Sequence, residues 1–247
     1  MWKRHISMAV MLLGVASLTY TVLTRSTRAQ VAGKRVACSA TILTKYYDAM
    51  GKLRRTETSV LANRVDGSRV RMRLTVDNHP DGMKTVVDLA KGFRIAVDPV
   101  SQSITTYKLA GSEMQMLSAT PTCSATNATA QTTMLGYSVL LDHEQHTFGP
   151  MSVKEDKWLA PSLGCLVMKR SYQMFNNGAL TGSTVEEVIA VTVGTPDPEL
   201  FQIPSDYTER TPSEAMAERA AILGKECTYC DHAKETPDKA YWSRHNF

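Results

Sequence analysis

The segment Asp142-His-Glu-Gln-His146 contains two histidines, His143 and His146. It resembles the H-E-x-x-H metal-binding motif of metalloproteases at first sight. A metalloprotease helix places its histidines four residues apart, so that both face one zinc ion. Here the separation is three, and the segment runs into Gly149-Pro150 instead of a helix. We therefore expect no metal site. An enzymatic role would depend on these histidines and on the Cys/His set near the C-terminus.

Other signatures of catalysis are missing from the sequence. The chain has no G-x-S-x-G nucleophile motif, no phosphate-cradling glycine loop and no dinucleotide fingerprint. Its serine, histidine and aspartate residues are not grouped in any pattern that would join them in catalysis. The sequence predicts a protein that is not an enzyme, has no catalytic residues and needs no cofactor.

The five cysteines include one pair whose positions fit a structural disulfide. Cys123 lies in a segment that interrupts the strand pattern, and Cys165 begins a strand. A bridge between them would close a loop of about 42 residues and stabilise the protein by roughly 3–4 kcal/mol through chain entropy. The alternative is two buried thiols. Cys38 is then left without a partner.

Cys227 and Cys230 form a Cys-x-x-Cys motif in the C-terminal segment. Haem attachment requires a histidine directly after the second cysteine, but Asp231 stands there. A thioredoxin-type redox pair requires a preceding βαβ unit, which the pattern lacks. A zinc site with His232 and His245 has enough ligands but not the spacing of a common zinc finger. A local disulfide or a metal clip is the simpler interpretation.

The first 29 residues have the layout of an export signal. Lys3 and Arg4 precede an apolar run from Ile6 to Leu23, and a small-x-small sequence ends at Ala29. The run is also about long enough to remain as a membrane anchor. Segment 1–29 is therefore a signal peptide or an anchor, and we expect a periplasmic or secreted protein, with tethering to the inner membrane as the alternative.

The excess of positive charge belongs to this N-terminal segment. The chain carries 28 Lys and Arg against 24 Asp and Glu, a net charge of +4. Four of the basic residues and none of the acidic ones lie in the first 29 residues, so the remainder is neutral. A neutral body lacks the basic face needed to bind phosphates along a nucleic acid, and we expect no nucleic-acid partner.

Residues 36–210 have the pattern of an antiparallel β domain of about 9–11 strands. Short alternating runs are separated by turns such as Asp66-Gly67 and Asn176-Asn177-Gly178. In the run 69–76, valine, methionine and leucine alternate with arginine and threonine, which predicts a sheet with one face wetted by solvent. Apolar positions on two such runs are candidate lipid-contacting residues: Val70, Met72, Leu74, Phe93, Ile95 and Val97.

Two further segments complete the organisation. An insertion at 111–133 breaks the strand rhythm with one short helical stretch, and a binding site, if the protein has one, is expected beneath it. After strand residues ending near Val193, Pro196, Pro198 and Pro204 stop the sheet. Phe201, Ile203 and Tyr207 are placed to plug the end of the barrel or to pack over its edge. Residues 211–247 are expected to form a helix that starts with a capping box, followed by a flexible tail with the Cys-x-x-Cys motif.

The layout resembles the lipoprotein-sorting carrier family of bacterial envelopes, whose Lol-carrier-like fold is an open half-barrel. A closer resemblance is to exported proteins of Acidobacteria-like bacteria, through Arg64-Val-Asp-Gly-Ser68, Asp98-Pro-Val-Ser-Gln-Ser-Ile-Thr-Thr-Tyr107, Trp158-Leu-Ala-Pro-Ser-Leu-Gly-Cys165 and Gly194-Thr-Pro-Asp-Pro-Glu-Leu-Phe201. The carrier resemblance implies a curved antiparallel sheet whose concave face holds acyl chains.

Together these observations predict a monomeric, mainly β protein that binds a lipid or an acylated protein in the cell envelope. The alternative is an anchored sensor or interaction module that acts through an envelope membrane protein.

Overall fold

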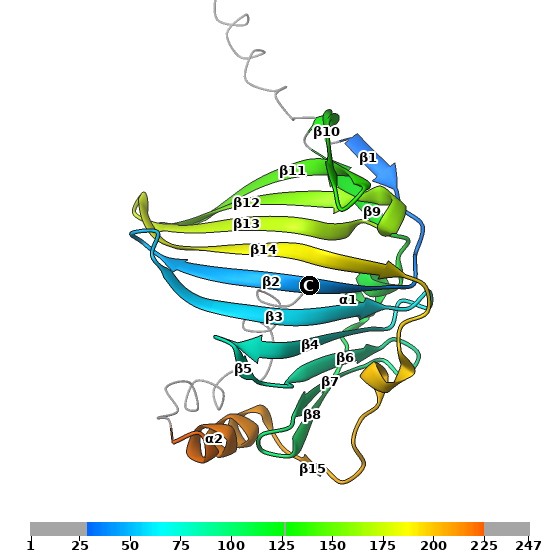
Figure 1. The fold of residues 1–247 in the computed structure, drawn as a ribbon, viewed down its shortest axis with the longest axis vertical. Helices are drawn as coiled ribbons and strands as arrows, with labels where there is room; N and C mark the ends of the chain where they lie inside the picture. Colours follow the sequence, from blue (N-terminus) through cyan, green and yellow to red (C-terminus); the bar gives the residue numbers. More distant parts are fainter. Residues whose placement is uncertain (1–28, 126, 225–247) are drawn as a thin grey trace, which may run out of the picture.

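One large antiparallel sheet forms the body of the molecule (Figure 1). The computed structural model describes residues 29–125 and 127–224, so the expected signal segment and Cys227 and Cys230 lie outside the described residues. The sheet does not close into a barrel, because its path ends at two different strands, β10 and β15. Its strands in spatial order are β10 (Asn127–Met134), β11 (Tyr137–Phe148), β12 (Met151–Ala160), β13 (Leu166–Asn176), β14 (Ala179–Val193), β2 (Cys38–Asp48), β3 (Leu53–Asn63), β4 (Arg69–Val76), β6 (Lys84–Asp88), β7 (Phe93–Asp98), β8 (Ser103–Lys108) and β15 (Thr208–Glu209).

The predicted open antiparallel half-barrel is confirmed, with a larger number of strands. Counting the two-residue strand β5 (His79–Pro80), which pairs with β4, the described residues form a 13-stranded sheet, against the 9–11 expected. Only β15 is parallel to its neighbour, β8. The predicted turn at Asn177-Gly178 joins β13 to β14, with φ of 49° and 79°, the left-handed pair that a two-residue hairpin requires.

The insertion 111–133 differs from its prediction in its second half. Helix α1 (Gly111–Ser118) occupies the first half, as expected, and lies behind the strands in Figure 1. The rest forms two strands, β9 (Thr122–Ala125), which pairs with β1 (Ala29–Ala32), and β10. Threonine is common in this segment, and its β-branched side chain favours strand when a partner such as β11 is available.

The sheet has an inner face and an outer face, which we define by residues of β4. Arg69 and Arg71 point to the inner face, and Val70 between them points to the outer face. Val70, Ala62 and Val86 are buried on the outer face against Leu200, Phe201 and Ile203 from the segment after β14. The short helix η2 (Pro198–Phe201) presents Leu200 and Phe201, and Ile203 follows it, so this segment packs on the outer face of β3, β4 and β6. The sequence had predicted that it would plug the end of the barrel or pack over the edge of the sheet.

Helix α2 (Pro212–Ile222) follows and starts with the predicted capping box. The Thr211 side chain accepts from the Glu214 backbone N–H, and the Glu214 carboxylate accepts from that of Thr211. Arg219 on this helix forms ion pairs with Asp81 and Asp98, which bind α2 to the sheet near β8. Burial alone would raise the pKa of Asp81, but Arg73 and Arg219 hold it below its ordinary value.

An ion pair joins two strands that are not neighbours in the sheet. Arg71 on β4 and Glu186 on β14 approach to 2.7 Å, although β2 and β3 lie between their strands. On a flat sheet, three inter-strand spacings would separate these strands by roughly 14 Å. The intervening strands carry the short inner-face side chains Thr44 and Ser59, which leave room for the contact. Helix α1 covers this inner face, which we call the concave face, and its main core consists of Ala40, Ile42, Val139, Ala160, Leu163, Leu166, Met168 and Val188.

Candidate ligand-binding cavity

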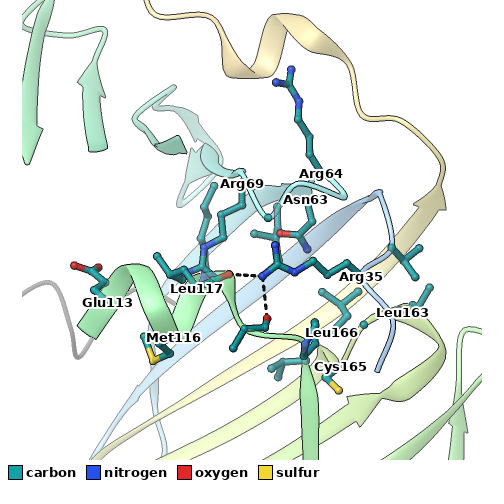
Figure 2. Close-up of a pocket in the computed structure, with 18 of the residues that line it drawn as sticks. Arg35, Asn63, Arg64, Arg69, Glu113, Met116, Leu117, Leu163, Cys165 and Leu166 are labelled. Carbon is teal, nitrogen blue, oxygen red and sulfur yellow. Dashed lines mark hydrogen bonds between the residues drawn. The ribbon is translucent and has the colours of Figure 1, made fainter. Parts of the chain in front are cut away.

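A cavity of about 910 Å³ lies between the inner face of the sheet and the insertion that contains α1 (Figure 2). The sequence placed a candidate site under this insertion, and the cavity is found there. Its remaining wall comes from the connection between β12 and β13, which includes the short helix η1 (Pro161–Leu163). A volume of this size falls within the range of roughly 300–1,000 Å³ that is typical of ligand pockets.

Apolar side chains from the sheet, from α1 and from η1 form one part of the wall. The sheet and the η1 connection supply a floor that is continuous with the main core, and α1 supplies a cover. Met116, 68% exposed, and Leu117 belong to this cover. The apolar lining residues are Val36, Ile42, Leu61, Leu109, Met116, Leu117, Leu163, Leu166, Val167 and Val188.

Charged residues form the other part of the cavity wall, and the basic residues among them outnumber the acidic ones. Six arginines and Lys108 line the cavity, against three glutamates, a formal excess of four positive charges. The charged lining residues are Arg35, Arg64, Arg69, Arg71, Arg94, Arg170, Lys108, Glu113, Glu186 and Glu187. The cavity is therefore amphipathic, with an apolar floor and a cationic side.

Arg35 joins the insertion to the sheet. Its guanidinium donates to the backbone carbonyls of Leu117, at 2.6 Å, and Ala119, at 2.9 Å, at the end of α1 (Figure 2). The guanidinium lies directly over Gly67, where an added Cβ would approach its Nη1 to 2.1 Å. Gly67 also has a φ of +89°, which L side chains rarely adopt. The turn predicted at Asp66-Gly67 thus also makes room for Arg35.

Arg69 and Arg94 lie on neighbouring positions of the inner face. Both pair in register with Val87, Arg69 from β4 and Arg94 from β7. Arg94 forms an ion pair with Glu113 of α1. Burial lowers the pKa of Arg69 to about 10, and the guanidinium groups of Arg94 and Arg35 act in the same direction, whereas Glu113 opposes them.

A belt of alternating charges continues from the cavity across the inner face. We use the name charge belt for Arg71, Glu186, Arg170, Glu155, Lys157 and Glu144. Successive members are 2.7 to 3.6 Å apart between nitrogen and oxygen. Burial would raise the pKa of Glu186, but Arg71 and Arg170 hold it below its ordinary value. Arg71, Glu186 and Arg170 of this belt line the cavity beside the apolar floor.

The predicted disulfide between Cys123 and Cys165 is confirmed. It joins β9 of the insertion to the residue before β13, and Cys123 is fully buried against Leu140 and Leu159. Cys165 itself lines the cavity. The covalent bond therefore fixes one end of the insertion at the cavity wall, while Arg35 holds the end of α1.

The six candidate lipid-contacting residues lie on the outer face, away from the cavity. Val70 and Val97 are buried, and Val70 packs against Leu200, Phe201 and Ile203. None of Val70, Met72, Leu74, Phe93, Ile95 and Val97 is among the residues that line the cavity. Contact of these six residues with a lipid stays a prediction that the arrangement does not test.

The cationic lining of the cavity escaped prediction, although the sequence contains its signal. Arg69, Arg71 and Arg73 alternate with apolar residues, and the sequence predicted for them only a charged face wetted by solvent, without showing which face is concave. These arginines point to the concave face, where Arg71 is 20% exposed and Arg73 26%. A period of two tells which residues share a face but not which face is concave.

The two histidines of β11 do not share a ligand. At a separation of three in a strand they point to opposite faces, and His143 pairs with Asp156 while His146 contacts Glu144. Within the described part of the chain, no three His, Cys, Asp or Glu side chains group closely enough to hold a metal ion. Across residues 29–125 and 127–224, no helix has the length and apolarity needed to cross a bilayer.

Comparison with known proteins gives distant likenesses. No protein-family model and no curated protein matches the sequence. Among solved structures, PNGF-II is similar at 15% identity with a TM-score of 0.40, over 75% of this chain and 33% of that one. This chain thus spans about a third of the length of PNGF-II.

Two further solved structures carry names that match the resemblance drawn from the sequence. A LolA superfamily protein from Nitrosomonas europaea has 6% identity and a TM-score of 0.35, over 70% of this chain and 93% of that one. A putative outer membrane lipoprotein-sorting protein domain from Vibrio parahaemolyticus has 9% identity and a TM-score of 0.28, over 67% and 89%. At these scores both likenesses are distant, and the nature of a ligand must come from the chemistry of the cavity.

Proposed function

We propose that the protein binds the acyl chain of a lipid or of an acylated protein in the cavity beneath α1, as a non-enzymatic component of the cell envelope. The single observation that supports this proposal best is the amphipathic cavity of about 910 Å³, with an apolar floor on the concave face and a cover built from α1. Transfer of an acyl chain from water to such a floor is favourable by about 0.8 kcal/mol for each methylene group buried.

Placement in the envelope has two supports. The first 29 residues have the composition of an export signal or an anchor. The Cys123–Cys165 disulfide fits an oxidising compartment such as the periplasm, since cytosolic thiols are kept reduced.

Titration of the purified protein with a fluorescent long-chain fatty acid tests the proposal. We expect saturable binding at one site per molecule. Met116→Glu places a charge on the cover of the cavity and should weaken binding at least tenfold. Gln115→Glu is the matched control, because Gln115 is exposed on the same helix, does not line the cavity, and receives the same charge. Absence of saturable binding, or equal loss in both variants, would exclude an acyl site at this position.

A further inference from the structure

Three hairpin turns lie together at one end of the sheet, on the left in Figure 1. They join β11 to β12, β13 to β14 and β2 to β3. The register of these strands aligns one residue from each of five strands in a single row: His146, Val153, Met174, Gly182 and Asp48. The three turns extend beyond this row, and we use the name turn end for residues 48–54, 146–154 and 173–182.

The turn end is separate from the cavity beneath α1. The cavity lies toward the opposite ends of these strands, where Asn63 ends β3 and Leu166 begins β13. No residue of the turn end is among those that line the cavity. A ligand in the cavity therefore leaves the turn end accessible.

Large apolar side chains of the turn end are exposed to solvent. Met50, in the turn between β2 and β3, is 83% exposed, and Phe148, at the end of β11, is 66% exposed. Leu53, Met151 and Met174 are between 36% and 47% exposed. Phe148 and Met151 lie opposite each other in the register of β11 and β12. None of these five residues belongs to a core cluster of the described part of the chain, and exposed apolar groups of this kind mark interaction sites.

The charge of the turn end is positive. Its one acidic residue, Asp48, forms an ion pair with Arg54 at 2.6 Å. Its other basic residues are Lys52 and Lys154, which give it a formal excess of two positive charges. The chain after residue 29 is neutral as a whole, so this excess is a local property of the turn end.

We propose that the turn end docks on the surface of a lipid bilayer that contains anionic lipids, with Met50, Phe148 and Met151 inserted between the headgroups. This inference goes beyond the proposed function. Peripheral membrane binding combines burial of apolar side chains with attraction of basic residues to anionic headgroups, and the turn end presents both kinds of residue. Fluid lipids rearrange around narrow turns, whereas a stable protein interface requires a larger complementary surface.

A tryptophan placed in the turn end reports its contact with lipid. Phe148→Trp is made in the full chain and mixed with vesicles of phosphatidylcholine and phosphatidylglycerol in equal parts, whose brominated acyl chains quench tryptophan fluorescence on contact. Subtracting the quenching of the unsubstituted protein gives the added quenching at position 148. Val65→Trp is the matched control, because Val65 is 65% exposed in the turn between β3 and β4, at the opposite end of the sheet. We expect the added quenching to be at least threefold larger at position 148 than at position 65.

Removal of the positive charges tests the electrostatic part. Lys52→Gln with Lys154→Gln, in the Phe148→Trp background, should reduce the added quenching at least threefold at a vesicle concentration below saturation. Lys34→Gln with Lys91→Gln removes the same charge at exposed residues outside the turn end and should leave the quenching unchanged. Sodium chloride at about 0.5 M should also weaken it, because salt screens exposed charges.

A second reporter covers a variant that fails to fold. Met50→Trp changes the most exposed of the five apolar residues, and the same increase in quenching is expected there. Thermal unfolding identifies the folded variants, and either reporter that folds is sufficient.

Each other outcome overturns the proposal. Equal added quenching at positions 148 and 65 would show that lipid contact is not specific to the turn end. No added quenching at position 148 would exclude docking on a bilayer and favour a protein partner for this surface. Added quenching that is as strong with phosphatidylcholine alone would exclude recognition of anionic lipid. All three results leave acyl binding in the cavity untouched, because that site is tested by the fatty-acid titration.

Discussion

At the scale of single residues, the wall of the cavity depends on Gly67 and Arg35, whose close contact tolerates few substitutions. Gly67 allows the turn and the close approach of Arg35, and Arg35 in turn holds the end of α1. The turn at Asp66-Gly67 was predictable from its composition. The contact with Arg35 was not, because Arg35 and Gly67 are brought together only by the packing of the connection before β2 against the β3–β4 hairpin.

Substitution of Gly67 by alanine should therefore cost more than its backbone conformation alone. Gly51 has a similar φ of +75°, and nothing lies within 4 Å of an added Cβ there. Gly51→Ala should lower the free energy of unfolding by about 1–2 kcal/mol, the cost of a left-handed L residue. Gly67→Ala carries the same cost and also displaces the Arg35 guanidinium. Urea denaturation of both variants measures the difference, and equal losses would mean that Arg35 is not confined by Gly67.

At the scale of elements, the insertion is the part that the sequence describes least well. The short helix at its start was expected, and so was the Cys123–Cys165 bond, which is suited to fasten an insertion in an exported protein. Strands β9 and β10 were missed, since their threonine-rich composition becomes strand only through pairing with β1 and β11. Whether such a segment forms a strand depends more on the neighbouring strands and side chains that it packs against than on its own sequence.

Removal of the disulfide should loosen the insertion and destabilise the protein. The bond closes a loop of 42 residues. Cys123→Ala with Cys165→Ala should reduce the free energy of unfolding by about 3–4 kcal/mol through chain entropy. Denaturant unfolding under non-reducing conditions gives the value. Cys38→Ala, at a buried cysteine that forms no disulfide, is the control and should keep the sensitivity to a reductant. An unchanged stability of the double variant would show that the contacts of β9 alone hold the insertion.

At the scale of the whole molecule, the charge belt connects strands that are far apart in the sheet. Glu186 contacts both Arg71 and Arg170, and its pKa lies below the ordinary value of 4.5. A lowered folded-state pKa contributes stability that is present above the unfolded value and lost as the pH falls through the folded one. The belt should therefore stabilise the sheet at neutral pH, and its contribution should begin to decline as the pH falls below 4.5.

Glu186→Gln should reveal this dependence. At pH 7 the variant should lose about 2–3 kcal/mol of unfolding free energy, somewhat less than a fully buried pair, because the charges remain partly exposed. At pH 3 the difference between the two proteins should be smaller, because the stability contributed by a carboxylate with a lowered pKa declines as the pH falls below the unfolded value of 4.5. Urea denaturation at both pH values gives the comparison, with the exposed Glu187→Gln as the control. A difference that is the same at pH 3 and pH 7 would contradict a role for the charge of Glu186.

The fold class was predictable because alternating runs and turn residues determine strand pairing locally. The apolar residues of β4 and β7 were predicted as candidates for lipid contact, but Val70 is covered by Leu200, Phe201 and Ile203. Whether the charged or the apolar face of β4 meets α1 depends on the packing of the whole sheet, and a period of two in the sequence does not show it. The sequence predicted a site beneath the insertion because the insertion interrupts the pattern of strands. It did not predict that arginines line this site, because the pattern does not show which face of the sheet the insertion covers.

The dependence of affinity on acyl chain length tests the central claim most directly. Calorimetric titration of the full chain with alkanoates of eight, ten and twelve carbons compares ligands that differ only in methylene groups. If the chain lies on the apolar floor, each added methylene should tighten binding up to about fourfold, from a transfer free energy of about 0.8 kcal/mol. Affinities that do not change with chain length, or no binding at all, would contradict an acyl-binding cavity.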